Sequence, residues 1–218
     1  MQQLCIGRYG RSIKHSMEHN ESSGPMGRPR SFDIDRALDR ALRVFWRKGF
    51  EGTSLSDLTK AVGVNRPSLY AAFGDKKALF RKALDRYLTG PASYTQEALK
   101  EPTARAVVER LLQGAADLNA APRNPGGCLT VQGALVCGEA GDSIRRELVA
   151  CRAAGEAALR RRFRRAKSEH DLPADTDPAD LARYLAAIIY GMAVQAAGGA
   201  SRDKLQHVVE MTLRTLPL

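Results

Sequence analysis

The sequence predicts an all-α protein, and three observations indicate this fold class. Apolar residues recur at three- and four-residue steps in nearly every segment after Asp33, which is the period of an amphipathic helix. Ser, Asp, Asn and Gly stand where these helices are expected to begin and end. No stretch of useful length alternates apolar and polar residues as a half-buried strand does. The 218 residues suffice for one large or two small domains with a buried core.

The N-terminal part of this pattern contains four helices of unequal length. Ser54 and Asp57 form a capping-box sequence, in which the serine hydroxyl and the acidic side chain each accept from a backbone N–H of the other residue. Asn65 is a further N-cap, and Pro67 follows in the first turn, where its missing N–H costs nothing. Gly63 ends the helix before it. These signals predict helices over residues 33–48, 54–62, 65–73 and 75–89.

The C-terminal part also has only helical periodicity. Asp142, Asp177 and Ser201 are expected to cap helices at their N-termini. A loop rich in Pro and Gly precedes a short apolar segment that begins at Cys128. The predicted helices cover residues 103–120, 128–138, 142–169, 177–198 and 201–216.

Positive charge is concentrated in the first 90 residues. The chain has a net charge of +10 and a pI of about 9.8. Residues 1–90 carry 17 Lys and Arg against 9 Asp and Glu, whereas residues 91–218 carry 17 against 15. A basic balance indicates a polyanion partner, either nucleic acid or an anionic membrane surface. The asymmetry assigns nucleic-acid binding to the N-terminal part and another task to the C-terminal part.

Several classes of protein are disfavoured by what the sequence lacks. No apolar run approaches the length of a membrane-spanning helix, and the N-terminus has no signal-peptide pattern, so we expect a cytoplasmic protein that does not enter a membrane. The four cysteines show neither CxxC spacing nor a nearby pair of histidines, so no zinc site and no cofactor are expected. The C-terminal half has only His170 and His207 and no glycine-rich phosphate loop, so we expect no enzyme.

The second and third predicted helices have helix-turn-helix spacing, because a turn of about three residues containing Gly63 joins them. The recognition helix of such a motif enters the major groove with its N-terminal residues toward the base edges. Arg66 has the fork that matches guanine O6 and N7, and the ring of Pro67 can contact a thymine methyl. Ser68 shares this first turn. Tyr70 can donate its hydroxyl to a phosphate.

Other residues near the motif are candidates for contacts to the DNA backbone. Ser54 and Lys76 stand at helix N-termini, which favour anions. Arg28 and Arg30 precede the first helix, and they form either an arm that enters a minor groove or an unattached basic segment. Four large apolar residues of the motif are expected in the core rather than on DNA: Phe45, Trp46, Leu69 and Phe73.

The stretches GRPRSFD and ALRVFWRKGFEGTSLSDLTKAVGVNRPSLYAAFGDKKALFRKAL resemble the DNA-binding domain of the TetR family of bacterial transcriptional regulators. The resemblance is specific, because the caps, the Gly-Val turn, the Ser-Leu-Tyr run and the following Lys occur together. It implies a DNA-binding domain over residues 26–75 and a ligand-binding and dimerisation domain over residues 76–218. Residues 1–25 are expected to be a disordered basic tail or an artefact of an upstream start site, because the pattern opens at Met26.

The family resemblance also implies the mode of action. A dimeric, one-component regulator, typically a repressor, would bind a palindromic operator in double-stranded DNA. The last two helices would supply the homodimer interface, and a small-molecule effector in the C-terminal domain would release the DNA. The matching positions of the family hold the same recognition-helix contacts and the phosphate-binding Lys76.

The helices beyond the DNA-binding part are apolar on one face and can enclose a cavity. The resemblance favours a ligand pocket there, and the sequence GGCL at a helix start is similar to one branch of the family. Ordinary core packing is the alternative for each residue. The candidate pocket residues are Cys128, Leu129, Gln132, Leu135, Val136, Leu148, Arg152, Tyr184, Ile188 and Met192.

Cys128 carries an alternative hypothesis for regulation. A helix N-terminus stabilises a thiolate, and the preceding Pro-Gly-Gly sequence indicates an accessible loop. Cys128 is therefore either a sensor of oxidants or electrophiles or a small apolar residue packed at a helix start. Cys137 and Cys151 are expected to be buried.

A run of five arginines over residues 160–165 offers a second nucleic-acid patch. The arginines lie on all sides of a helix rather than on one face. A solvated and partly paired surface is the preferred interpretation.

Overall fold

The computed structural model describes residues 33–135 and 141–216, and within these ranges it contains ten helices and no strand. The predicted all-α fold class is therefore confirmed. The helices are α1 (Ile34–Lys48), α2 (Leu55–Val62), α3 (Arg66–Phe73), α4 (Lys76–Thr89), α5 (Tyr94–Ala98), α6 (Ala104–Ala120), α7 (Leu129–Leu135), α8 (Asp142–Ser168), α9 (Pro178–Ala197) and α10 (Arg202–Thr215).

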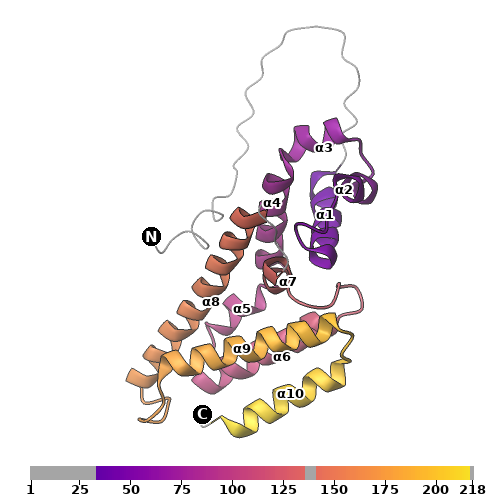
Figure 1. The fold of residues 1–218 in the computed structure, drawn as a ribbon. Helices are drawn as coiled ribbons and strands as arrows, with labels where there is room; N and C mark the ends of the chain where they lie inside the picture. The colour runs from indigo at the N-terminus through magenta and orange to yellow at the C-terminus, as the bar shows by residue number, and fades with distance from the viewer. Residues whose placement is uncertain (1–32, 136–140, 217–218) are drawn as a thin grey trace.

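The helices form a head and a body, which α4 connects (Figure 1). The head consists of α1, α2 and α3, and α3 lies at the end of the molecule farthest from α10. In the body, α6 packs against α9 and α10, and the long α8 packs against α9. The short α7 lies between the two parts, because it contacts α1 and α4 on one side and α8 and α9 on the other.

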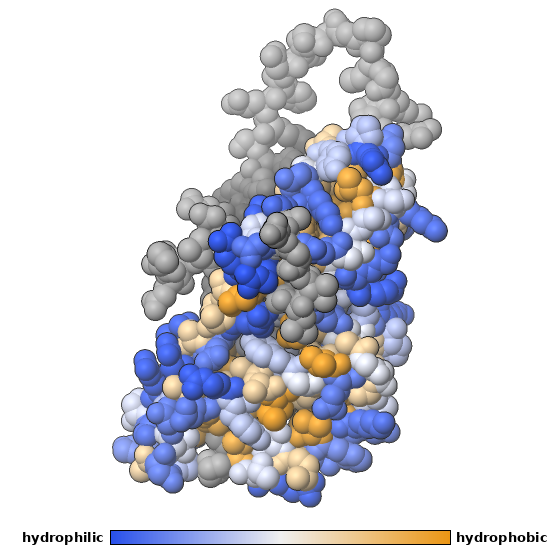
Figure 2. Space-filling view, viewed as in Figure 1, coloured by the Kyte–Doolittle hydropathy of each residue, from blue (hydrophilic) through white to orange (hydrophobic). Residues whose placement is uncertain are grey.

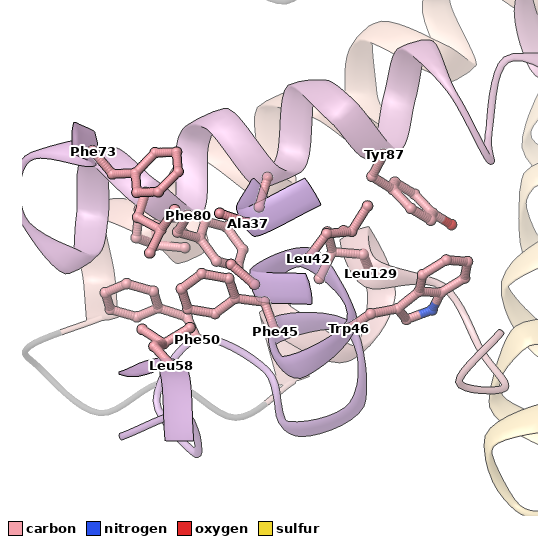
Figure 3. Close-up of a cluster of buried hydrophobic side chains, with 14 of the residues drawn as sticks. Ala37, Leu42, Phe45, Trp46, Phe50, Leu58, Phe73, Phe80, Tyr87 and Leu129 are labelled. Atoms are coloured by element: carbon pink, nitrogen blue, oxygen red, sulfur yellow. The ribbon is translucent and has the colours of Figure 1, made fainter. Parts of the chain in front are cut away.

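Two clusters of buried apolar side chains correspond to this division. The first cluster joins α1, α2, α3 and α4 and is rich in aromatic rings (Figure 3). It continues into the body through Leu129 of α7 and through Ile144 and Leu148 of α8, all of which are fully buried. The second cluster lies among α6, α8, α9 and α10. The head and the body therefore share one core at their junction.

The N-caps predicted in the head are confirmed. The Asn65 Oδ1 accepts from the Ser68 N–H at 2.9 Å, and the Asp75 Oδ1 accepts from the Ala78 N–H at 2.7 Å. The Ser54 hydroxyl accepts from the Asp57 N–H at 3.0 Å, and the Asp57 carboxylate accepts from the Ser54 N–H at 2.9 Å. Each cap satisfies a backbone donor that a helix start leaves without a partner.

The structure differs from the sequence-based prediction at two helix starts. Helix α5 was not predicted, because its five residues have no side-chain cap and are too few to show a period. Asp142 is the first residue of α8 rather than its cap, and Gly141 at the cap position provides no side-chain hydrogen bond. The Asp142 carboxylate instead pairs with Arg145 at 2.5 Å and Arg146 at 3.2 Å. These partners, Arg145 first, lower the pKa of Asp142.

Burial in α8 differs from the prediction at two residues, Arg162 and Cys151. Within the run of five arginines, Arg162 is only 5% exposed, while the other four are exposed. Its Nη2 donates to the carbonyls of Glu101 and Pro102, both at 2.9 Å, so it fastens α8 to the turn before α6. Cys151 is half-buried rather than buried. Cys137 lies outside the described residues.

The capping box of α2 makes the stability of the head depend on pH. The Lys48 Nζ lies 2.6 Å from the Asp57 carboxylate. Its hydrogen bond, together with those from Ser54, holds the pKa of Asp57 well below its usual range. The unfolded chain therefore binds a proton at higher pH than the folded chain does. The stabilisation is complete above the unfolded pKa of about 3.9 and is lost as the pH falls toward the folded value.

We expect Asp57→Asn to reduce this pH dependence, because asparagine keeps an acceptor for the cap but carries no charge. The melting temperature of the variant should lie below that of the wild type at neutral pH. The gap should narrow as the pH falls from about 5 to about 2. Thermal unfolding followed by circular dichroism measures both values. A gap of constant size across this range would contradict the assignment.

Candidate nucleic-acid interface

The helix-turn-helix is formed by α2, the turn of residues 63–65, and α3. Gly63 ends α2 in the left-handed conformation, with φ of 82°, and its N–H donates to the Thr59 carbonyl at 2.9 Å. Glycine adopts this conformation without the strain that a Cβ would cause. Arg40 of α1 donates to the Val62 carbonyl at 3.1 Å, which binds the end of α2 to the head. These two hydrogen bonds fix the α2 end of the turn.

Helix α3 is anchored by one face and presents the other to solvent. Leu69 and Phe73 are 1% and 2% exposed, as predicted. They belong to the first core cluster, which is called the head core below. Arg66 and Pro67 are exposed, and Tyr70 is 40% exposed. Ser68 is half-buried, and its N–H donates to Asn65. The four predicted base and phosphate contacts of α3 therefore lie on its first two turns, and none of them belongs to the core.

A polar groove of about 760 Å³ runs between α2 and the start of α3. Ser56, Thr59 and Lys60 of α2 line it together with Arg66 and Ser68 of α3. The three residues of α2 were not singled out from the sequence. Their spacing is the signal that identifies them, because positions 56, 59 and 60 lie on the face of α2 opposite its buried residues. A groove with Lys60 and Arg66 on its walls suits a polyanion.

Lys76 is the first residue of α4 and is half-buried. Its Nζ lies 4.5 Å from the centroid of the Phe50 ring, a cation–π contact. Burial lowers the pKa of Lys76, and the nearby carboxylates of Glu51 and Asp57 partly oppose this shift. The ammonium therefore rests on an aromatic ring beside the helix start.

The remaining predicted DNA contacts differ in their surroundings. Ser54 is exposed, but its hydroxyl already donates to Asp57 at 2.8 Å as part of the capping box. A phosphate would have to replace Asp57 as the acceptor. Arg28 and Arg30 lie outside the described residues.

Four of the predicted pocket residues meet at α7. The Cys128 Sγ accepts from the Tyr87 hydroxyl at 3.4 Å and lies 3.1 Å from the Thr130 Oγ1. Arg152 of α8 donates to the Thr130 carbonyl. The other two members of this group are Leu129, which is fully buried, and Gln132, whose Nε2 donates to the Gly126 carbonyl at 3.2 Å.

Tyrosine side chains surround this group, and sequence reasoning missed them. Burial raises the pKa of Tyr190 to about 12, with opposing contributions from Arg152 and Cys128. Burial also raises the pKa of Tyr87 and Tyr94, and the Cys128 sulfur adds to both shifts. These phenols come from three different helices or helix ends, so no local pattern in the sequence links them to Cys128.

Of the other pocket candidates, Leu148 belongs to the first core cluster, against which Cys128 packs, whereas Tyr184, Ile188 and Met192 lie elsewhere. Tyr184 is 42% exposed, and with Ile188 it lines a separate groove of about 400 Å³ between α9 and α10. Met192 is 1% exposed within the second core cluster, and Leu148 is fully buried in the first. Leu135 is the last residue of α7, and Val136 lies outside the described residues.

The described part of the chain contains neither a candidate metal site nor a helix that could cross a membrane. No three His, Cys, Asp or Glu side chains in residues 33–135 and 141–216 are grouped so that they could hold a metal ion. Across the same ranges, no helix is both long enough and apolar enough to cross a membrane.

Comparison with known proteins identifies the two parts of the chain. Residues 37–83 match the family model described as bacterial regulatory proteins, tetR family. Residues 102–212 match the model described as the tetracyclin repressor-like C-terminal domain. The first match contains α2, the turn and α3, and the second extends from the turn before α6 into α10.

Individual relatives match most of the chain. The HTH-type transcriptional repressor ComR of Escherichia coli is 34% identical over 193 residues, which are 88% of this chain and 92% of ComR. The HTH-type transcriptional regulator YezE of Bacillus subtilis is 32% identical over 88% of this chain and 100% of its own length.

A solved structure matches equally well. It is a cysteine mutant of the TetR family transcriptional regulator CifR, in complex with a 26-bp double-strand operator DNA. The identity is 42% and the TM-score 0.82, over 87% of this chain and 100% of the CifR chain. With both family models and these relatives in agreement, the chain belongs to the TetR family of bacterial regulatory proteins.

Proposed function

We propose that the protein is a transcriptional repressor of the TetR type that binds operator DNA through α2, the turn and α3. The observation that carries this proposal is the division of α3 into a buried face and an exposed face, whose side chains are free to contact bases. Leu69 and Phe73 fix the helix, while Arg66, Pro67 and Tyr70 face solvent at the tip of the molecule (Figure 1). ComR is named as a repressor, and CifR is bound to operator DNA in its structure, which supports the same role here.

Within this interface the residues have separate tasks. Arg66 reads a guanine edge, and Pro67 and Ser68 contact neighbouring bases. Tyr70, Lys76 and Ser54 bind phosphates, and Lys60 joins them from the groove wall. Arg28 and Arg30 enter an adjacent minor groove. Residues 26–75 thus form the DNA-binding domain, although α4 shares its core.

The protein acts as a homodimer through α9 and α10. Apolar side chains gather over the part of the surface where these helices lie (Figure 2). Tyr184, Val194 and Met211 lie on these two helices and are 42%, 51% and 56% exposed, and Tyr184 and Met211 line the same groove. Exposed apolar residues that lie together on a surface mark an interaction site. Two copies related by a two-fold axis would cover these faces and present two α3 helices to a palindromic operator.

A small-molecule effector releases the operator by binding among α4, α7, α8 and α9, within the domain of residues 76–218. The group formed by Cys128, Gln132 and Arg152 offers a thiol, an amide and a guanidinium beside three phenols. Release requires the effector to bind the DNA-free conformer more tightly than the DNA-bound one. The cytoplasm is the compartment in which such a regulator meets its operator.

A second candidate function is regulation by oxidation or alkylation of Cys128. The thiol is half-buried, and Tyr87 and Thr130 hold it in a fixed position. Two CifR structures that are 42% identical to this chain are cysteine mutants in complex with operator DNA. Modification of Cys128 would displace Tyr87, which belongs to the head core.

We expect Arg66→Ala to weaken operator binding by about 1 to 3 kcal/mol and to relax one base position. The duplex for this measurement is selected from random sequences with the wild-type protein. Affinity is measured by fluorescence anisotropy on this duplex and on single-base variants of it. Unchanged affinity and unchanged base preference would show that α3 does not read bases through Arg66.

Lys76→Ala serves as the matched comparison within the same series. Loss of a phosphate contact should weaken binding to all duplexes by a similar factor and reduce the salt slope by about one. Lys77→Ala, one residue further along α4, is the control for net charge. If Lys77→Ala has the same effect as Lys76→Ala, the Lys76 contact is not specific.

We expect Met211→Arg to convert the dimer to a monomer, because it places an unpaired charge in the interface. The dissociation constant of the dimer should rise by about tenfold or more. Sedimentation velocity measures the change. Val149→Arg is the control, since Val149 is 45% exposed on α8, outside α9 and α10. A Met211→Arg protein that remains as dimeric as the control would exclude this interface.

The thiol hypothesis predicts that alkylation of Cys128 by N-ethylmaleimide weakens operator binding and that Cys128→Ser abolishes the effect. Peptide mass spectrometry reports the fraction of Cys128 modified, and anisotropy reports the affinity. Full modification of Cys128 with unchanged affinity would eliminate the thiol switch and leave the effector model intact.

A further inference from the structure

The turn of Gly126 and Gly127 is the place where the head meets the body. The Trp46 Nε1 of α1 donates to the Gly127 carbonyl at 2.8 Å, and this hydrogen bond is buried. The two residues are 81 positions apart in the sequence. Trp46 itself is only 2% exposed. A buried donor that lost this acceptor would retain the full cost of its desolvation.

Both glycines are held closely by body helices. A Cβ on Gly126 would lie 2.7 Å from the Ala196 carbonyl oxygen at the end of α9. Gly127 has a φ of 92°, and a Cβ there would lie 2.5 Å from the Gln132 Nε2 and 3.1 Å from the Ala197 Cβ. Only glycine combines this conformation with so close an approach. The turn is therefore clamped between α7 and α9.

On the head side, Trp46 joins α1 to α4. Its ring makes an edge-to-face contact with Tyr87, with centroids 4.7 Å apart and an interplanar angle of 79°. The Tyr87 hydroxyl in turn donates to the sulfur of Cys128, the residue after Gly127. Figure 3 shows Trp46 and Tyr87 beside Leu129, at the end of the head core away from Phe50 and Phe73. One indole thus contacts α1, α4 and the clamped turn.

We propose that Trp46 is the residue that couples the DNA-binding head to the body, through its hydrogen bond to the Gly126–Gly127 turn. The inference rests on the proposed function, in which α3 binds operator DNA. A displacement of α7 or α9 moves the Gly127 carbonyl and breaks a single buried bond, so the head senses two discrete arrangements rather than a gradual drift. Trp46 is a positioning residue, because it lies in the core and does not face the DNA.

A polar link between α4 and α8 is of a different kind. Arg81 donates to both oxygens of Glu147 of α8, at distances of 2.6 to 3.1 Å. Both side chains are about 40% exposed, so salt screens this pair. The Trp46 bond is neutral and buried, and salt does not screen it. Coupling through Trp46 is therefore expected to persist at high salt.

The experiment uses the reciprocity of coupling, since DNA must affect the turn if the turn affects DNA binding. Amide hydrogen exchange is followed by mass spectrometry in the peptide of residues 124–135, with and without the selected operator duplex. In the wild type, the duplex should slow exchange by about fivefold or more. In Trp46→Phe, which keeps an aromatic ring but has no N–H donor, the change should stay below about twofold.

Phe163→Leu is the control, because Phe163 is a fully buried aromatic residue of α8 in the second core cluster, outside the head and the turn. It should behave as the wild type does. Glu147→Gln tests the surface pair, and coupling should survive in it. Trp46 is the only tryptophan of the chain, so its emission in the unmodified protein should shift at duplex concentrations that saturate binding.

The other possible results distinguish failure of the proposed function from failure of the coupling inference. If the wild type binds no duplex, the proposed function fails. If it binds duplex but neither the exchange of residues 124–135 nor the Trp46 emission changes, the coupling inference is overturned while the proposed function stands. An undiminished duplex effect in Trp46→Phe would also overturn it. The emission measurement requires no variant, so poor folding of Trp46→Phe would not prevent a decision.

Discussion

The packing of α1 against α4 is the constraint on which the rest of the molecule depends. Phe45 and Phe50 both meet Phe80 edge to face, with centroids 5.0 and 5.3 Å apart. Such aromatic pairs contribute roughly 0.5 to 1.5 kcal/mol each beyond the area they bury. Leu69 and Phe73 of α3 pack into the same cluster, so the orientation of the recognition helix follows that of α1 and α4. Because α4 also continues into the body, a rearrangement of the body can reach α3 only through this core.

The charges of the head are arranged around the same core. Arg86 of α4 pairs with Asp39 at 2.9 Å and Asp35 at 3.2 Å, and Lys48 pairs with Asp57. Three acidic residues of the head are thereby neutralised by bases of the head and of α4. Among the described residues, Lys60 and Arg66 have no such ion pair. The positive charges of Lys60 and Arg66 at the groove between α2 and α3 are therefore not offset by an ion pair within the head.

The N-caps and the buried face of α3 in the head, which local sequence determines, were predicted correctly. Ser54 and Asn65 cap helices because their partners lie three residues away, and Leu69 and Phe73 are buried because their spacing repeats along one face. The location of the pocket candidates depended on which neighbour each helix face meets. Periodicity identifies an apolar face but not its partner, so Tyr184, expected beside Cys128, lies on the surface of α9. The burial of Arg162 has the same origin, because its carbonyl partners are about 60 residues away.

The separation of the two faces of α3 has a consequence for how such proteins diversify. The side chains that hold the helix and the side chains that face outward share no position, and the N-cap at Asn65 precedes both sets. Outward residues can therefore be exchanged without loss of core packing or of the cap. A duplicated gene could acquire a new DNA target through a few changes at positions 66, 67 and 70 while its body kept the same response. Stability and specificity would then evolve as nearly independent traits on an eight-residue helix.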